Sequence, residues 1–170
     1  FKFSGDSMHI AMIGKDEEKN NYLSLMIASI DTTSNNDKNK RKNKDLEEKE
    51  AKEEKKKKKV KFNKKEIDFG RFHKAINWSD DNQYLAYSKY HYANNNSRVF
   101  DLCLYDVKSN EKEWITNNLR ATYPVFTPDN KIIFISHSNS TSNFYEVDID
   151  NLDQIEQLTF FKGDTQLLTP

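Results

Sequence analysis

The chain has 170 residues, enough for one ordinary domain, and its formal net charge of +0 combines two oppositely charged parts. Residues 37–65 hold 15 Lys or Arg against 7 Asp or Glu, so the remaining residues carry a net charge of −8. A single cysteine, Cys103, excludes an internal disulfide framework and favours a reducing compartment, so we expect a cytoplasmic location without a membrane partner.

The first predicted elements are two apolar runs at residues 8–13 and 22–30. The polar stretch "GKDEEKNN" joins them, which predicts a β-hairpin whose loop starts at Gly14. Residues 35–65 then form a low-complexity, charged insert. Such a segment buries too little apolar surface to offset the entropy of ordering, so we expect a disordered segment or a single helix held by Glu–Lys pairs.

The rest of the chain alternates short apolar runs with clusters of turn residues, which predicts β-strands. One set of four strands is expected at 74–79, 83–90, 99–107 and 111–116, with a long loop at 91–98. A second set is expected at 122–127, 131–137, 143–149 and 154–160, with a turn at 150–153. Because no window outside the charged run has sustained helical spacing, we predict an all-β chain.

The two sets are copies of one pattern. "AINWSDDNQYLAYS" at 75–88 aligns with "YPVFTPDNKIIFIS" at 123–136 without a gap. The alignment places Trp78 on Phe126 and Leu85 on Ile133. It also pairs the Asp-Asn sequences, which predict two-residue hairpin turns because Asn and Asp tolerate a positive φ.

Four strands per repeat of forty-odd residues are typical of β-propeller blades. We therefore predict about three four-stranded blades of a partial β-propeller, with Trp78 and Phe126 each packed between adjacent blades. The chain divides into a partial blade at 1–34, the insert at 35–65, blades at 66–120 and 121–163, and the start of a further blade at 164–170. We place the insert between the third and fourth strands of the first blade, and expect an internal segment of a longer protein.

The passages "INWSDDNQYLAYS…DLCLYDVKSNEKEWIT" and "PVFTPDNKIIFIS…NFYEVDIDNLDQIEQLTFF" resemble the WD-like repeats of TolB and of tricorn-type serine peptidases. Asn82 and Asn130 stand where that pattern has Gly, and Asp80 stands where it has Pro. "FGRFHKAINWSDDNQYLAYSKY" is most similar to the tricorn-type propeller. That resemblance implies a non-catalytic segment that guides peptides to a serine protease site elsewhere in the parent chain.

Candidate reactive residues do not form a recognisable catalytic or metal-binding pattern, so we predict no catalytic residue, no cofactor and no metal. The histidines are far apart in sequence, and adjacency alone does not make Ser136, His137 and Ser138 a catalytic group. Repeat-related carboxylates are expected to form turns, and Cys103 is expected to be an inert core thiol. The four tyrosines of the second strand region are expected in the core (Tyr84, Tyr87) and in a loop (Tyr90, Tyr92). The histidines are His9, His73, His91 and His137, and the repeat-related carboxylates are Asp81, Asp129, Asp106 and Asp148.

Two function classes therefore remain open. The first is the propeller of a tricorn-like serine peptidase, which admits peptides or unfolded polypeptide and excludes folded proteins, in a parent that could be a homo-oligomer. The second is a TolB-like protein-interaction propeller without enzymatic activity. A third role, polyanion binding by the Lys-rich insert, is less favoured because acids are mixed with the bases and aromatic residues are nearly lacking, so no nucleic-acid partner is expected.

Overall fold

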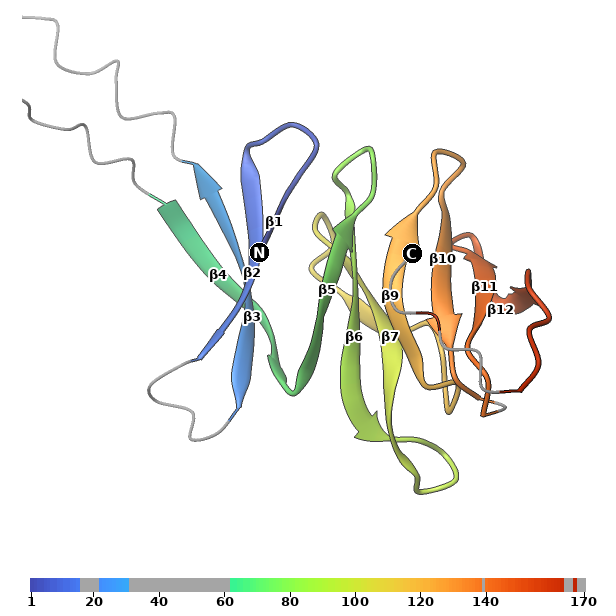
Figure 1. Ribbon diagram of the computed structural model, residues 1–170. Helices are drawn as coiled ribbons and strands as arrows, with labels where there is room; N and C mark the ends of the chain where they lie inside the picture. Colours follow the sequence, from blue (N-terminus) through green and yellow to red (C-terminus); the bar gives the residue numbers. More distant parts are fainter. Residues whose placement is uncertain (16–21, 31–61, 139, 164–166, 168–170) are drawn as a thin grey trace, which may run out of the picture.

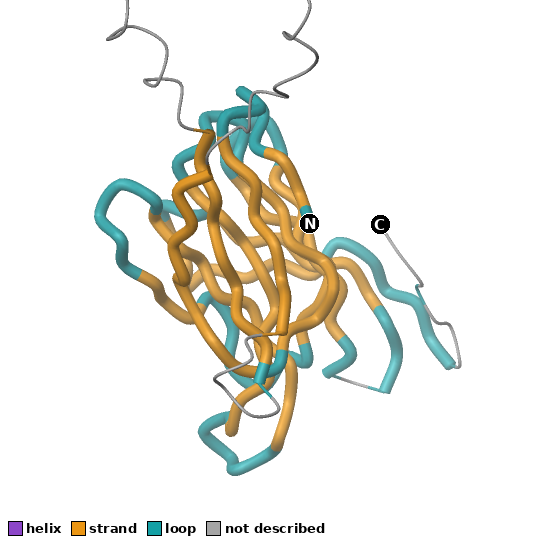
Figure 2. The backbone as a smooth tube through the Cα atoms, turned by 90° about the vertical axis from the view of Figure 1, so that its left-hand side faces the viewer, coloured by secondary structure: helices purple, strands orange, loops and turns teal. Residues whose placement is uncertain are grey.

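The computed structural model describes residues 1–15, 22–30, 62–138, 140–163 and 167. These residues form strands and connecting turns without a helix, as predicted (Figures 1 and 2). Among them there is accordingly no helix long and apolar enough to cross a membrane. The strands are β1 (Lys2–Phe3), β2 (His9–Lys15), β3 (Leu23–Ile30), β4 (Phe62–Gly70), β5 (Phe72–Trp78), β6 (Tyr84–Tyr92), β7 (Arg98–Asp106), β8 (Lys112–Trp114), β9 (Ala121–Phe126), β10 (Lys131–Ser136), β11 (Asn143–Asp148) and β12 (Asn151–Gln157).

The strands form three antiparallel sheets of four, each a simple up-and-down meander. The first sheet contains β1 to β4, the second β5 to β8 and the third β9 to β12, side by side in Figure 1. The first strand of the second sheet contacts the first strand of both neighbouring sheets. Both predicted sets of four strands are therefore confirmed, and the N-terminal strands belong to a preceding sheet of the same kind.

Several predicted boundaries were wrong. Gly14 does not begin a loop but lies in β2 opposite Ser24. β4 begins at Phe62, so the last four residues of the range assigned to the insert are strand. The insert does lie between the third and fourth strands of its sheet, but its predicted disorder concerns residues 31–61, outside the described residues.

The hairpins of the second and third sheets extend further than the turn residues suggested. Tyr90 and Tyr92 belong to β6 rather than to a loop, because their backbones pair with β7 opposite Phe100 and Arg98. Residues 151–153, predicted as a turn, begin β12. In both cases the backbone ladder continues into the segment predicted as a loop or turn.

The Asp-Asn hairpins use one left-handed residue rather than the predicted two-residue turn. Asn82 has a φ of 61°, whereas neither Asp80 nor Asp81 has a positive φ. The Ser79 hydroxyl donates to Asp81 Oδ1 at 2.6 Å and accepts from the Tyr84 amide at 2.9 Å. These side-chain bonds hold the turn, so a positive φ is needed only at the Asn.

The same turn occurs a third time, at Ser4–Ser7, where the sequence analysis had missed it. The Ser4 hydroxyl donates to Asp6 Oδ1 at 2.5 Å, and Ser7 has a φ of 58°. Ser4 and Ser79 therefore occupy equivalent positions. Gly5 stands where the later copies have Asp80 and Pro128, and Ser7 stands where they have Asn82 and Asn130, which hid the match in sequence.

The gapless alignment was wrong after the turn. Trp78 lies opposite Leu85, whereas Phe126 lies opposite Ile132 and not Ile133. The turn of the second sheet contains one more residue, and a one-residue shift exchanges the two faces of a strand. Ile132 is fully buried and Ile133 is half-buried, which agrees with the shifted pairing.

Apolar side chains fill the two spaces between the three sheets. Trp78, 5% exposed, belongs to the cluster between the first and second sheets, and its Nε1 donates to the Lys2 carbonyl at 3.2 Å. Phe126, 8% exposed, belongs to the cluster between the second and third sheets. The two aromatic residues are therefore equivalent, as predicted.

A threonine fastens the end of the fourth strand in two of the sheets. The Thr116 hydroxyl accepts from the Leu102 amide at 2.9 Å and donates to Asp101 Oδ1 at 3.0 Å. The Thr159 hydroxyl accepts from the Phe144 amide at 2.9 Å and donates to Asn143 Oδ1 at 3.0 Å. The repeated Ile-Thr and Leu-Thr endings thus make the same pair of hydrogen bonds, which we call the threonine latch.

Candidate functional site

The meander gives the molecule two different ends. At one end, the second strand of each sheet turns into the third, and the fourth strand leads to the next sheet; we call this end the connector face. The other end carries the hairpins between strands one and two and between strands three and four; we call it the turn end. The two ends differ in charge, whereas exposed aromatic side chains occur at both, since Phe3 and Phe62 lie at the turn end of the first sheet.

Exposed aromatic side chains gather at the connector face. Phe69 ends β4, Tyr92 ends β6 and Trp114 ends β8, with exposures of 54%, 62% and 41%. The remaining aromatic residues at this face are Tyr22, Phe160 and Phe161, exposed by 52%, 74% and 43%. Such a concentration of solvent-exposed rings is a feature of interaction surfaces.

Polar groups hold several of these rings in place. The Trp114 ring stacks on the His91 imidazole with 3.9 Å between centroids. The Lys89 ammonium lies 5.7 Å from the Phe69 centroid, and the Arg98 guanidinium lies 4.8 Å from the Tyr92 centroid. The rings thus stand in positions set by neighbouring side chains, which lowers the entropy cost of binding through them.

Most exposed charges at the connector face are positive among the described residues. They are Lys15, Arg71, Lys74, Arg98, Arg120 and Lys162. Two described carboxylates at this face, those of Asp68 and Asp101, are buried, with exposures of 3% and 0%. The exposed Glu66 carboxylate accepts from the Ser24 hydroxyl at 2.7 Å. The connector face therefore presents cations and aromatic rings together.

Asp68 is buried between the first two sheets and binds groups from the second. Lys89 and Lys112 donate to its Oδ1 at 2.6 and 2.7 Å, and the Tyr87 hydroxyl donates to Oδ2 at 2.8 Å. Burial raises the pKa of the Asp68 carboxyl, but the hydrogen bonds from Lys112, Lys89 and Tyr87 outweigh it and hold the pKa below its usual value. This cluster fastens the two sheets together just beneath the connector face.

Asp101 fixes the connection from the second sheet to the third. Its carboxylate accepts from the Asn118 and Leu119 amides at 2.6 and 3.0 Å, and lies 2.8 Å from His91 Nε2. His91 therefore joins the Asp101 carboxylate to the exposed Trp114 ring. An Asp–His pair can orient a nucleophile, but no described Ser, Thr or Cys hydroxyl or thiol hydrogen-bonds to His91.

Two further histidines lie where the second and third sheets meet at the connector face. The His73 ring contacts the Tyr123 ring with 4.4 Å between centroids. Burial lowers the pKa of His73, with smaller contributions from Lys74 and His137. Burial and then Arg120 lower the pKa of His137. Both imidazoles are therefore neutral near pH 7 and gain charge on acidification.

Among the described residues, the hydroxyls of the adjacent Ser136 and Ser138 hydrogen-bond to each other and not to His137. The Ser136 hydroxyl donates to the Leu119 carbonyl at 2.6 Å and is fully buried, while His137 Nδ1 lies 2.8 Å from the Ser142 hydroxyl. No described carboxylate orients the His137 imidazole. The bonds of Ser136 and His137 are thus structural.

The remaining residues considered in sequence take mostly structural positions. Tyr87 is fully buried and Cys103 is 3% exposed, and burial raises the pKa of both side chains. Tyr84 is half-buried at the edge of the second core cluster. His9 is considered below. The repeat-related carboxylates cap turns. Asp81 accepts from the Gln83 amide, and Asp106 accepts from the Lys108 and Ser109 amides. Asp129 hydrogen-bonds with the Thr127 side chain, and Asp148 accepts from the Asp150 amide.

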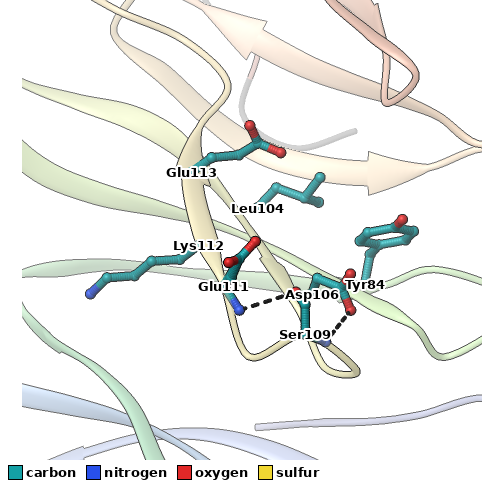
Figure 3. A pocket seen from close by; sticks show the side chains of 7 residues that line it. All are labelled: Tyr84, Leu104, Asp106, Ser109, Glu111, Lys112 and Glu113. Atoms are coloured by element: carbon teal, nitrogen blue, oxygen red, sulfur yellow. Dashed lines mark hydrogen bonds between the residues drawn. The ribbon is translucent and has the colours of Figure 1, made fainter.

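The turn end carries the opposite charge in the second and third sheets. Its carboxylates there are Asp80, Asp81, Asp106, Glu111, Asp129, Asp148, Asp150 and Asp153, against the ammonium groups of Lys108 and Lys131. A hollow of about 420 Å³ lies beside it on the second sheet, next to Tyr84 and walled by Asp106, Glu111 and Glu113, while Lys112 points away (Figure 3). Within the described ranges, no group of three His, Cys, Asp or Glu side chains is arranged to hold a metal ion.

Comparison with known proteins bears on the fold. No family model and no curated protein matches the sequence. The structure is similar to TolB from Acinetobacter baumannii, with a TM-score of 0.59 and 15% identity over 96% of this chain. The fold is a TolB-like β-propeller. The putative TolB from Agrobacterium tumefaciens is also similar, with a TM-score of 0.47 and 14% identity, over 94% of this chain and 60% of that one.

The three sheets are thus three consecutive blades, with β1, β5 and β9 as the innermost strands. The chain spans about a third of the Acinetobacter protein, covering 32% of its length. At 15% identity the likeness establishes the fold and leaves function to be argued from the surface. Nothing in these comparisons bears on the resemblance to tricorn-type peptidases.

Proposed function

We propose that the TolB-like propeller segment is a protein-interaction module that binds its partner at the connector face. The exposed aromatic residues at that face are the observation that carries the proposal. Because the neighbouring exposed charges are positive, the partner is an acidic protein segment that also carries apolar side chains. Rings supply contact area at a low entropy cost, and the cations select the charge of the partner.

The direct test uses a fluorescein-labelled peptide that alternates Glu with Leu and Phe. Fluorescence anisotropy should show saturable binding that weakens with added salt, because exposed charges are screened. Arg120→Glu reverses a connector-face charge and should weaken binding by about tenfold, equivalent to ~1.4 kcal/mol. The matched control is Lys108→Glu at the turn end, which should leave the affinity within about twofold.

The aromatic contribution needs a separate variant. Trp114→Ala removes an exposed ring and should also weaken binding of the Glu-Leu-Phe peptide, by roughly 1–2 kcal/mol. A peptide in which Lys replaces every Glu should not bind. Equal binding of the two peptides, or equal effects of Arg120→Glu and Lys108→Glu, would rule out the connector face as the binding surface.

A second candidate is the peptide-guiding propeller of a tricorn-like serine peptidase. The sequence around Trp78 supports it, since "FGRFHKAINWSDDNQYLAYSKY" resembles that family. In this candidate, peptides or unfolded polypeptide take the place of a protein partner, and the parent is an enzyme and could assemble as a homo-oligomer. The parent sequence beyond residue 170 distinguishes the candidates: a PDZ-like module followed by a serine nucleophile favours the peptidase.

Both candidates share two expectations for this segment. It should not hydrolyse peptides by itself; turnover abolished by Ser136→Ala and Ser138→Ala would contradict that. We also propose a cytoplasmic location, supported by the single buried thiol of Cys103. Fluorescence microscopy of the tagged full-length parent tests the location.

A further inference from the structure

The three blades carry the same groove beside their third and fourth strands, but the groove of the first blade differs in charge. It lies between the first and second blades at the turn end and has a volume of about 300 Å³. Its lining includes Ile27, Ser29, Asn63 and Lys65 from the first blade and Val107 and Asn110 from the second. The hollow of Figure 3 is the corresponding groove of the second blade.

Strand pairing identifies which residues correspond. His9 pairs with Ser29 in the first blade, and Tyr84 pairs with Asp106 in the second, so Ser29 takes the place of Asp106. Ile27 pairs with Lys65 in the first blade, and Leu104 pairs with Glu113 in the second, so Lys65 takes the place of Glu113. Lysine therefore replaces glutamate at this position of the groove.

The remaining carboxylate is replaced as well. Asn63 pairs with Ser29 in the first blade. In the second blade, the Asp106 amide donates to the Glu111 carbonyl at 2.9 Å. Because Ser29 and Asp106 correspond, Asn63 takes the place of Glu111. In the third blade, Glu156 pairs with Glu146 and again supplies a carboxylate. The described lining of the first groove contains no carboxylate, whereas both other grooves contain several.

Several hydrogen-bond donors converge at this groove. Lys65 Nζ donates to the Asn110 amide oxygen, and the Tyr105 hydroxyl donates to the same oxygen at 3.0 Å. These two bonds orient the amide and leave its NH₂ group as a donor. An ammonium group has three donors, so Lys65 can bind Asn110 and a ligand together. The His9 ring also lines the groove; its buried Nδ1 makes no hydrogen bond to a described residue and lies 3.9 Å from Asp6 Oδ1.

We propose that the groove between the first and second blades binds a small organic phosphate. Lys65, Asn63 and Ser29 bind the phosphate oxygens, and the side chains of Ile27 and Val107 contact a compact apolar group of the same ligand. A cationic group with neutral donors above an apolar floor has the composition of a site for such an amphipathic anion. The volume is large enough for a phosphate joined to one aromatic ring.

Phenyl phosphate is the probe, titrated by isothermal calorimetry and followed by changes in the amide NMR spectrum. Saturable binding is expected, with the largest shifts at Ser29, Asn63 and Lys65. Lys65→Glu installs the charge of the second blade's groove and should weaken binding at least about tenfold. Lys15→Glu is the matched control and should change the affinity less than about twofold, because the exposed Lys15 lies at the connector end of β2 and does not line the groove.

Three ligand controls separate the alternatives. Phenol tests the apolar part alone, while inorganic phosphate and sulfate test the anion alone; all three should bind more weakly than phenyl phosphate. Equal affinities for phenyl phosphate and sulfate would indicate an adventitious ion only and overturn the proposal. So would absence of saturable binding, or equal losses in Lys15→Glu and Lys65→Glu variants that keep the wild-type circular dichroism spectrum.

Discussion

At the scale of single residues, Asp68 is the buried carboxylate that connects the first two blades. Asp68→Asn removes the charge that pairs with Lys89 and Lys112, which would leave ammonium groups at a buried junction. Because the Lys112 side chain is 47% exposed and can return to water, we expect a loss of about 2–3 kcal/mol in the free energy of unfolding. Urea unfolding measures this loss.

The exposed Asp150 supplies the control for that variant. Asp150→Asn should change the free energy of unfolding by less than about 0.5 kcal/mol. If both variants unfold at the same urea concentration, the Asp68 cluster does not hold the first two blades together.

The half-buried His73 and His137 predict how stability depends on pH. Folding lowers the pKa of His73 and His137, so the unfolded chain binds their protons more readily. Their contribution to stability is therefore complete above the unfolded pKa near 6.5 and is lost as the pH falls through the lower folded values. Urea unfolding at pH 7.5 and 5.5 should show lower stability at pH 5.5.

The double variant His73→Gln, His137→Gln attributes that dependence to these two residues. It should reduce the difference in the free energy of unfolding between the two pH values. A double variant with an unchanged difference, or a wild-type chain more stable at pH 5.5, would contradict the assignment.

At the scale of the elements, the threonine latch should matter in both blades that carry it. Thr116→Val keeps the shape but leaves the Leu102 amide without its acceptor, which costs about 1–3 kcal/mol. Thr159 is half-buried, so Thr159→Val should cost less. Differential scanning calorimetry of both variants tests this order; a larger loss for Thr159→Val would contradict it.

The turns were predictable because their chemistry is local, but the register was not. Asn82 and Asn130 have φ values of 61°, as their residue type suggested. The turn of the second blade contains one extra residue, Gln83. A sequence alignment does not reveal it, because the apolar runs that follow the turn match equally well when moved by one residue. Pairing with the first strand decides the register, and it placed Ile132 rather than Ile133 in the core.

At the scale of the whole molecule, the repeat predicted the architecture but not the binding surface. Four strands per repeat and equivalent aromatic residues follow from sequence because each blade repeats them. The connector face assembles side chains such as Phe69, Tyr92 and Trp114 from separate blades and connections. The Asp68 cluster likewise joins Asp68 to Lys112, which lies 44 residues further along the chain. Neither arrangement leaves a local pattern.

Packing between blades should contribute equally at the two junctions described. Trp78→Ala and Phe126→Ala each open a cavity between neighbouring blades and should each cost about 3–5 kcal/mol. Urea unfolding compares them. A loss below about 1 kcal/mol for either residue would mean that it does not fill a space between blades.

Nuclear Overhauser contacts between strands test the equivalence of the blades most directly. The account predicts cross-strand contacts from Trp78 to Leu85 and from Phe126 to Ile132. Contacts from Phe126 to Ile133 in place of Ile132 would contradict the register of the third blade. Absence of a contact from Trp78 to Leu85 and from Phe126 to either isoleucine would contradict the arrangement of the chain as consecutive propeller blades.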